Sequence, residues 1–333
     1  MKIVHLPIEI AGQIGAICES LQKKQHFTRG YNFFSTYLAY KANLINADVF
    51  EMGRMFEEAI QHFDLFHYHY GLTLFPNFKD LEMLKRNNKP VVMHHWGNDV
   101  RMHSVASQHN PYVYTKDSPP EPMVRRSLQQ LSQYVSDAIV QDYEVLPNIQ
   151  PYYRRVHVIP LSLDTQKFSV SYPSLTEKSP LVIHAPTNRL FKGTVHIEKA
   201  IEQLKMELSF RYVRVEKMEH EEAVRLYQQA DIVIDQILCG SYGLLSVEAM
   251  AYGKPVIAYV RPDLLSKYDM SPPIVNANPD TIYDVLRELL LSPEKRVQAG
   301  MAGREYVMEL HDSKKVAEQL VKVYQLALED AKG

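Results

Sequence analysis

Residues 231–259 restrict the fold of this chain more than any other segment. An apolar run after Asp231 leads into a loop with two glycines, then a stretch without breakers, then Gly253 and a second apolar run. This order predicts a strand, a loop, a helix and a strand, which is the repeating unit of a parallel sheet wound by helices. Amides at the start of such a helix bind phosphate without a metal, and a carboxylate slightly further along, here Glu248, can accept hydrogen bonds from a ribose diol.

The segment resembles the donor-binding signature of the retaining glycosyltransferases with the GT-B fold, the glycosyltransferase family four group. The matching residues are Tyr242, Gly243, Glu248, Ala249, Met250, Gly253 and Pro255. Gly240 stands where the family has its first Glu, which faces the donor sugar, so this departure bears on donor choice and on activity. The alternative for the segment is a Rossmann-like helix that only packs.

The resemblance continues after an apolar run at 181–184, where Arg189 and Lys192-Gly193 are similar to the Arg and Lys-Gly pair of the family. It implies that these two cations neutralise the diphosphate leaving group. It also implies that Glu248 holds the ribose and that the diphosphate meets the helix start, at Ser241, Tyr242, Gly243, Leu244 and Leu245. No Asp-x-Asp pair occurs in the sequence, which favours a donor site without a metal. A solvated basic loop is the alternative for Arg189 and Lys192.

Polar residues at two other predicted strand ends are considered for sugar recognition and for metal binding. Asp235 and Gln236 follow an apolar run close to Gly240, so they could take over part of the sugar recognition. His67 and His69 alternate along a predicted strand and therefore lie on one face. No third metal ligand stands at a telling spacing from them, so no metal site is predicted.

The first half of the chain carries weaker signals. Residues 94–101 are similar to the His-x-Gly-x-Asp-x-Arg loop of the family. The resemblance makes His95 the counterpart of a histidine that faces the donor sugar, with His94 as the second candidate, and a buried structural histidine is the alternative for each. Asp99 and Arg101 are expected to brace the loop as an ion pair. Near the N-terminus, Gly12 lies in a small-residue turn and is a candidate nucleotide contact, with close packing of strand and helix as the alternative.

Alternating strand and helix patterns run through the chain and predict an α/β protein with two similar units. By resemblance this is the GT-B fold, two Rossmann-like parallel-sheet domains facing a cleft. The Ser-, Pro- and Thr-rich stretch 168–180 reads as the linker. We therefore expect an acceptor-side domain at 1–167, a nucleotide-sugar-binding domain at 168–313, and a C-terminal helix at 314–333 that crosses back to the first domain. The predicted strands are 1–7, 63–69, 90–93, 138–141, 156–160, 181–184, 210–214 and 232–234.

Composition excludes several classes of protein. A net charge of −2 over 333 residues shows none of the basic excess of a nucleic-acid binder. Two distant cysteines predict no disulfide, and the chain shows neither a signal peptide nor a membrane-spanning run, so a cytoplasmic location is expected. Basic residues with aromatic residues nearby leave peripheral contact with the inner face of the membrane as an option, although a solvated surface is the simpler interpretation. They are Lys23, Lys24, Arg29, Arg125 and Arg126.

The resemblance implies a retaining hexosyltransferase. It would move a sugar from a nucleoside-diphosphate sugar, with uridine diphosphate as the expected carrier, to a glycan or lipid-linked acceptor, without a metal or cofactor. Two alternatives stay open. One is a protein that binds a nucleotide sugar without transferring it, and the other is a sugar-nucleotide epimerase with the same two-domain plan.

Overall fold

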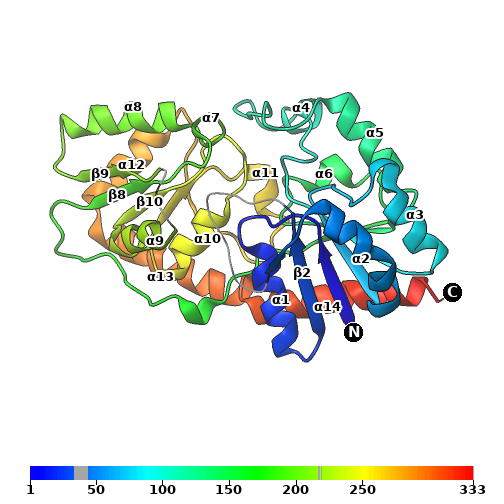
Figure 1. Cartoon of the computed structure of the whole chain (residues 1–333). Coiled ribbons are helices and arrows are strands. Elements are labelled where there is room, and N and C mark those ends of the chain that lie inside the picture. Colours follow the sequence, from blue (N-terminus) through cyan, green and yellow to red (C-terminus); the bar gives the residue numbers. More distant parts are fainter. Residues whose placement is uncertain (34–43, 217, 219, 333) are drawn as a thin grey trace. The chain divides into compact units, whose positions relative to one another are not determined.

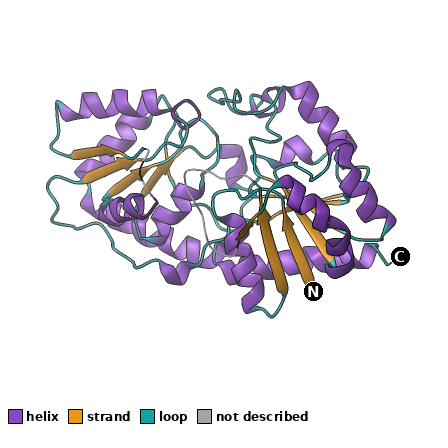
Figure 2. Ribbon diagram, viewed as in Figure 1, coloured by secondary structure: helices purple, strands orange, loops and turns teal. Residues whose placement is uncertain are grey.

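The computed structural model describes residues 1–33, 44–216, 218 and 220–332. It contains two compact units. Unit 1 comprises Met1–Val105, Ser118–Ser162 and Ser313–Gly333, and unit 2 comprises Ala106–Asp117 and Leu163–Asp312. Each unit has its own parallel sheet with helices beside the strands (Figure 1 and Figure 2).

Unit 1 is built on a seven-stranded sheet in the order β3-β2-β1-β4-β5-β6-β7, with every neighbouring pair parallel. Its strands are β1 (Lys2–Leu6), β2 (Phe27–Asn32), β3 (Leu44–Asn46), β4 (Leu65–His69), β5 (Val91–His95), β6 (Asp137–Val140) and β7 (Arg155–Val158). Its helices are α1 (Gln13–Lys23), α2 (Val49–His62), α3 (Lys79–Arg86), α4 (His103–Ala106), α5 (Glu121–Leu131), α6 (Leu146–Ile149) and α14 (Ser313–Asp330), with a 3₁₀ turn η1 (Pro76–Phe78).

Side-chain alternation divides the sheet of unit 1 into two buried faces. Val4, Phe66 and Met93 face a core that includes residues of α2, α3 and α5. Ile3 and Leu65 face the opposite core, which is formed with α1 and α14. Helix α1 lies beside the strands of unit 1 in Figure 1, and it contacts α14. The central strands are therefore covered on both sides, and each of them directs apolar side chains to both faces.

Unit 2 holds a five-stranded parallel sheet in the order β12-β11-β10-β8-β9. Its strands are β8 (Leu181–His184), β9 (Arg211–Arg214), β10 (Ile232–Ile234), β11 (Val256–Ala258) and β12 (Val275–Asn276). Its helices are α7 (Arg189–Lys192), α8 (Thr194–Lys205), α9 (His220–Gln229), α10 (Leu244–Ala251), α11 (Pro262–Leu265), α12 (Ile282–Leu291) and α13 (Pro293–Leu310), with a 3₁₀ turn η2 (Thr165–Lys167).

Helix α13 packs against α10 through glycine. A side-chain carbon at Gly300 would come within 2.2 Å of the carbonyl oxygen of Gly253, and one at Gly303 within 2.8 Å of the Met250 side chain. Only glycine allows two helices to approach this closely. The contact holds α10, which carries the predicted donor-binding residues, at a defined depth in unit 2.

The two units are not continuous in sequence. Residues 106–117, which the sequence places inside the first domain, lie in unit 2, and the C-terminal helix α14 lies in unit 1. The predicted linker at 168–180 also lies in unit 2: the Ser171 amide donates to the Tyr252 carbonyl at 2.9 Å, and the rings of Phe168 and Tyr252 lie 4.8 Å apart. Aromatic side chains thus attach this stretch to unit 2. The chain first passes to unit 2 after Val105, returns at Ser118, and passes again after Ser162, before the predicted linker begins. Within the described residues, every helix is too short or too polar to cross a bilayer.

Candidate functional site

The start of α10 in unit 2 is organised around the buried carboxylate of Asp235, which follows β10. Its Oδ2 accepts hydrogen bonds from the Gly243 amide at 3.0 Å and from the Ser246 hydroxyl at 2.6 Å, and its Oδ1 accepts one from Lys192 Nζ at 2.6 Å. Burial opposes ionisation of Asp235, but Lys192 and these donors outweigh it and lower the pKa of the carboxyl group. Asp235 is therefore ionised, and its charge lies at the positive end of the α10 dipole.

Lys192 reaches this position from α7, whose first amides are capped by Asn188. The Lys192 ammonium also donates to Gln236 Oε1 at 2.8 Å, and the Gln236 amide donates onward to the Ser241 carbonyl at 2.6 Å. Gly243 lies against this cluster, because a Cβ there would come within 3.1 Å of both Asp235 Oδ2 and Gln236 Oε1. The cluster fixes the loop that leads into α10. Asp235 and Gln236, predicted as sugar contacts, have polar partners inside the protein.

Glu248 is the fifth residue of α10 and is partly buried. Burial, and to a smaller extent the negative charge of Asp235, raises the pKa of Glu248 from 4.5 to about 7. No side-chain hydrogen bond to Glu248 is found among the residues that the structure describes. Its carboxylate is thus available to a ligand that brings its own donors.

The two predicted cations are held by different carboxylates. The exposed side chain of Arg189 donates from Nε to Glu216 Oε1 at 2.6 Å, and Glu216 also pairs with Arg214. This pairing raises the pKa of Arg189 and lowers that of Glu216. Lys192 is mostly buried against Asp235. Because it is exposed, Arg189 can exchange Glu216 for a phosphate at small cost, whereas Lys192 is fixed in place.

The other predicted donor-site residues lie just before α10 or in its first turn, and they differ in their contacts. The Tyr242 hydroxyl bonds the Tyr306 hydroxyl at 2.8 Å and His311 Nε2 at 3.1 Å, so this ring is attached to α13 and to the residue that follows it. The Ser241 hydroxyl is buried and has no hydrogen-bond partner within the described residues. Leu244 and Leu245 supply the first two amides of α10, which have no acceptor within the helix itself.

Gly240 shows why the first Glu of the family cannot simply be inserted here. Its backbone has φ +91°, and a Cβ would lie 2.8 Å from Cδ of Arg261 and 3.1 Å from Nδ2 of Asn110. Arg261 is almost fully buried, and its guanidinium pairs with Asp263 at 2.6 Å. The stem of Arg261 thus fills the space that a side chain at position 240 would need.

In unit 1, Gly12 precedes α1 with φ +78°, but the anion position at this helix start is already occupied. The buried carboxylate of Glu9 accepts hydrogen bonds from the amides of Ile14 at 3.1 Å and Gly15 at 3.0 Å. Burial raises the pKa of Glu9 to about 7, although these amides act in the opposite direction. A phosphate at Gly12 would have to displace a carboxylate of the chain itself.

His94 and His95 end β5 with opposite orientations. His95 is fully buried and uses both ring nitrogens, Nδ1 with Asp99 at 2.6 Å and Nε2 with the Tyr153 hydroxyl at 2.9 Å. In this conformation neither nitrogen is left for a sugar. His94 stacks on Trp96 with ring centres 3.9 Å apart.

The expected ion pair between Asp99 and Arg101 does not form. Asp99 pairs with His95, and the buried Arg101 pairs with Glu144 at 2.8 Å. Both side chains do brace the loop: Asp99 also accepts a hydrogen bond from the Trp96 amide at 2.9 Å, whereas Arg101 reaches a partner in another part of unit 1. Glu144 lies 43 residues away from Arg101, so no local spacing could have indicated it.

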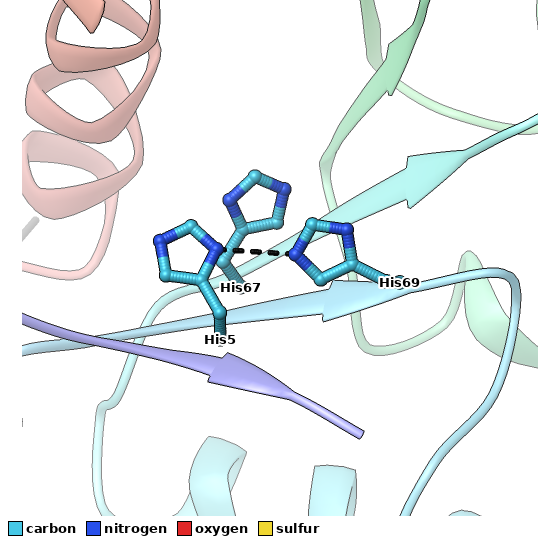
Figure 3. Close-up of side chains that lie close together, drawn as sticks. All are labelled: His5, His67 and His69. Carbon is cyan, nitrogen blue, oxygen red and sulfur yellow. Dashed lines mark hydrogen bonds between the residues drawn. The ribbon is translucent and has the colours of Figure 1, made fainter. Parts of the chain in front are cut away.

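His67 and His69 of β4 have a neighbour that the sequence did not indicate. His5 of β1 is paired in register with His67, and its Nδ1 lies 3.1 Å from His69 Nε2 (Figure 3). The three rings each offer a nitrogen, and these nitrogens lie within 4.8 Å of one another. His5 belongs to the neighbouring strand β1, so no spacing within β4 could have indicated it.

Residues 182–322 match a family model described as glycosyl transferase-like. A curated relative, the MMP α-(1→4)-mannosyltransferase of Mycolicibacterium hassiacum, is 24% identical over 235 residues, an alignment covering 62% of this chain. The chain spans 57% of the length of that relative.

Solved structures resemble the chain over nearly its whole length. The Anabaena protein HepE, in complex with UDP-glucose, has a TM-score of 0.63 at 13% identity and covers 98% of this chain and 99% of its own. MnaA of S. aureus, solved with UDP, has a TM-score of 0.57 at 14% identity and covers 98% of both chains. A putative UDP-N-acetylglucosamine 2-epimerase from Listeria monocytogenes has a TM-score of 0.59 at 12% identity and covers 99% of this chain and 97% of its own. The predicted α/β fold class, with two parallel sheets in the GT-B arrangement, is confirmed.

Proposed function

We propose that this chain is a retaining glycosyltransferase that moves a sugar from a nucleoside-diphosphate sugar, with uridine diphosphate as the carrier, to a glycan or lipid-linked acceptor. The glycosyl transferase-like match covers the segment with the donor-binding residues. The mannosyltransferase relative supports sugar transfer, and the neighbours solved with UDP-glucose and UDP support this class of donor. The enzymatic class thus rests on similarity, and the donor site rests on the geometry of unit 2.

The position of Glu248 carries the proposal. Its carboxylate has no protein partner within the described residues, and it lies four residues beyond the first amide of α10. Four residues of helix span about 6 Å, which suits a nucleotide with its phosphates at the helix start and its ribose diol beside Glu248. The diol hydroxyls would donate to the ionised carboxylate, and such charge-assisted bonds are stronger than neutral ones.

Positive charge for the leaving diphosphate would come from the protein alone. Lys192 gives two of its three N–H groups to Asp235 and Gln236, and the third is left for a phosphate oxygen. Arg189 would turn from Glu216 toward the diphosphate, exchanging one anionic partner for another. With the amides of Leu244 and Leu245, these groups stabilise the charge that develops on the leaving group, so no metal or cofactor is needed at the donor site. Retention would follow from attack on the same face, without a protein nucleophile.

Unit 1 offers an apolar cavity for the acceptor. A hollow of about 580 Å³ lies between β1, β2 and α2, and its lining includes Val4, Leu6, Met52 and Phe56. Its size and lining suit the apolar part of a lipid-linked acceptor. Such an acceptor would bring the chain to the inner face of the cytoplasmic membrane, although a soluble glycan is compatible with the same donor site.

The first experiment measures binding of UDP, GDP and ADP to the full chain by isothermal titration calorimetry. Each nucleotide sugar of the base that binds is then incubated with a panel of glycan and lipid-linked acceptors, and the products are analysed by mass spectrometry and NMR. Transfer with an unchanged anomeric configuration is the expected result. Binding of none of the three nucleotides would overturn the proposal.

A test variant with its control and two further outcomes separate the alternatives. Glu248→Gln should lose affinity for the nucleotide, whereas Glu202→Gln, which removes the same charge from an exposed position on α8, should not. Binding without transfer across the whole panel would favour a nucleotide-sugar-binding protein. Gly240, which stands where the resembled signature has a Glu, is the reason to consider this alternative. Conversion of the donor sugar without any acceptor would favour an epimerase, as the Listeria neighbour suggests.

A further inference from the structure

Four histidines gather on one face of the sheet in unit 1. They are His5 at the end of β1, His67 and His69 on β4, and His94 on β5, and none is more than 2% exposed. His5 lies opposite His67 in the strand register, and His69 lies opposite His94. They share the face that α1 and α14 cover. The fold thus brings together four imidazoles from three strands.

Half of the ring nitrogens in this cluster have no hydrogen-bond partner. The satisfied contacts are His5 Nδ1 with His69 Nε2 at 3.1 Å, His67 Nδ1 with the Tyr324 hydroxyl at 2.8 Å, and His69 Nδ1 with the Trp96 indole at 3.3 Å. Within the described residues, His5 Nε2, His67 Nε2 and both nitrogens of His94 are buried without a partner. Buried polar atoms are rarely left in this state, and each such atom needs an explanation, for example an ion or a water.

The rings of His5, His67 and His69 bring nitrogens close together, and those of His67 and His69 stack with ring centres 4.3 Å apart and 18° between their planes. His5, His67 and His69 each place one nitrogen within 4.8 Å of the other two, and Figure 3 shows the three rings side by side. A tetrahedral zinc ion with bonds of about 2.0–2.1 Å needs ligand nitrogens roughly 3.4 Å apart with their lone pairs aimed at the ion, so the stacked rings of His67 and His69 would have to turn apart to complete the site.

We propose that His5, His67 and His69 bind a divalent first-row transition metal ion such as Zn²⁺, and that His94 can supply a fourth nitrogen. The ring of His94 lies 5.5 Å from that of His67 and 5.6 Å from that of His69. Neutral imidazole suits zinc, copper and nickel, whereas magnesium and calcium prefer oxygen ligands. The ion would be structural, because the site is enclosed and the nucleotide site of unit 2 has its own cations.

Two side chains that contact the histidines, those of Tyr324 and Trp96, would be affected by metal binding. The Tyr324 hydroxyl of α14 orients His67 through Nδ1 and leaves Nε2 for the metal, which is the usual role of a group beyond the ligands. The ion would therefore tie the C-terminal helix to the sheet. Binding through His69 Nε2 breaks the bond to His5 and places a proton on His69 Nδ1, which then faces the indole N–H of Trp96. Trp96 must shift, and it is the only tryptophan of the chain.

The experiment uses the full chain without a histidine tag, treated with EDTA and titrated with Zn²⁺. We expect one zinc per chain by mass spectrometry, a saturable change in Trp96 fluorescence with the same midpoint, and a rise of several degrees in the unfolding temperature. Substituted Co²⁺ should give the strong visible absorption of a tetrahedral nitrogen site. A zinc content far below one per chain, or the absence of both the fluorescence change and the cobalt bands, would overturn the proposal and leave a hydrogen-bonded histidine network.

Variants then identify the ligands. His5→Gln and His67→Gln should each weaken zinc binding by at least 100-fold, and Tyr324→Phe should weaken it by about tenfold. His196→Gln, at an exposed position on α8 of unit 2, is the matched control and should bind as the wild type does. If a ligand variant fails to fold, the cobalt spectrum of the wild-type chain still decides the coordination. Unchanged zinc affinity in both folded ligand variants would refute this assignment.

Discussion

Replacing Glu248 with Gln should change how nucleotide affinity depends on pH. Burial and the charge of Asp235 raise the pKa of Glu248 to about 7, so without nucleotide the carboxyl group is about half protonated at pH 7. A ribose diol donates to the ionised form, and binding therefore requires the proton to leave. Wild-type affinity should rise through pH 7 and level off above it.

The expected magnitude follows from the ionised fraction. Exchanging a charged acceptor for a neutral one costs about 2 kcal/mol over two hydrogen bonds, which is roughly 30-fold in Kd at pH 8.5. At pH 6 only about one tenth of the wild-type carboxyl groups is ionised for a pKa of about 7. The ratio of the Kd of Glu248→Gln to that of the wild type should therefore fall to roughly threefold. The phosphate groups of the ligand also titrate in this range, but this effect cancels in the ratio.

This ratio is measured by isothermal titration calorimetry with UDP from pH 5.5 to 8.5. The proteins compared are the wild type, Glu248→Gln and the control Glu202→Gln. The stability of the free protein gives an independent check. A folded-state pKa of about 7 lies above the unfolded value of 4.5, so the contribution of Glu248 is fully present below pH 4.5 and is lost as the pH rises through 7. Between these limits the stability difference from Glu248→Gln should change by at most about 3 kcal/mol. A ratio of Kd values that does not vary with pH, or equal affinities at pH 8.5, would refute this reasoning.

Three further predictions concern unit 2 and are measured by urea unfolding. Gly240→Glu should destabilise the protein by about 1–3 kcal/mol, because the side chain meets Arg261 and the backbone has φ +91°; an unchanged midpoint would contradict the described packing. Lys192→Met should cost about 3–5 kcal/mol because it leaves Asp235 buried without its cation, and adding Asp235→Asn should recover part of the loss. Tyr242→Phe should cost about 1–3 kcal/mol through two lost hydrogen bonds without changing nucleotide affinity; weaker binding by the folded variant would place the hydroxyl in the site.

The sequence predicted those strands and helices whose signals lie within the element itself. The apolar runs at 181–184 and 232–234 became β8 and β10 with those bounds, and the Gly243 and Gly253 signals bracket α10. Helix α2 also carries a local signal, a capping box between Asp48 and Glu51. By contrast, the stretch 168–180 had the composition of a linker, but Phe168 and its neighbours pack on unit 2.

The candidate site was predictable as a set of residues but not as a set of contacts. Lys192, Asp235 and Gln236 were each named, and the structure joins them into one cluster that only their tertiary proximity reveals. Arg189 was expected beside Lys192 in function, but it pairs with Glu216. Hydrogen-bond partners 27 or 43 residues away have no periodicity that a sequence pattern could show.

The amino-acid sequence alone determined the alternation of strands and helices and the helix start that carries Glu248, because backbone preference and hydrophobic period act between near neighbours. Only the tertiary structure decided which charges are already neutralised, why Gly240 excludes a larger residue, and that His5 joins His67 and His69. These properties depend on side chains brought together across a sheet or between helices, where burial and geometry decide whether a polar group has a partner.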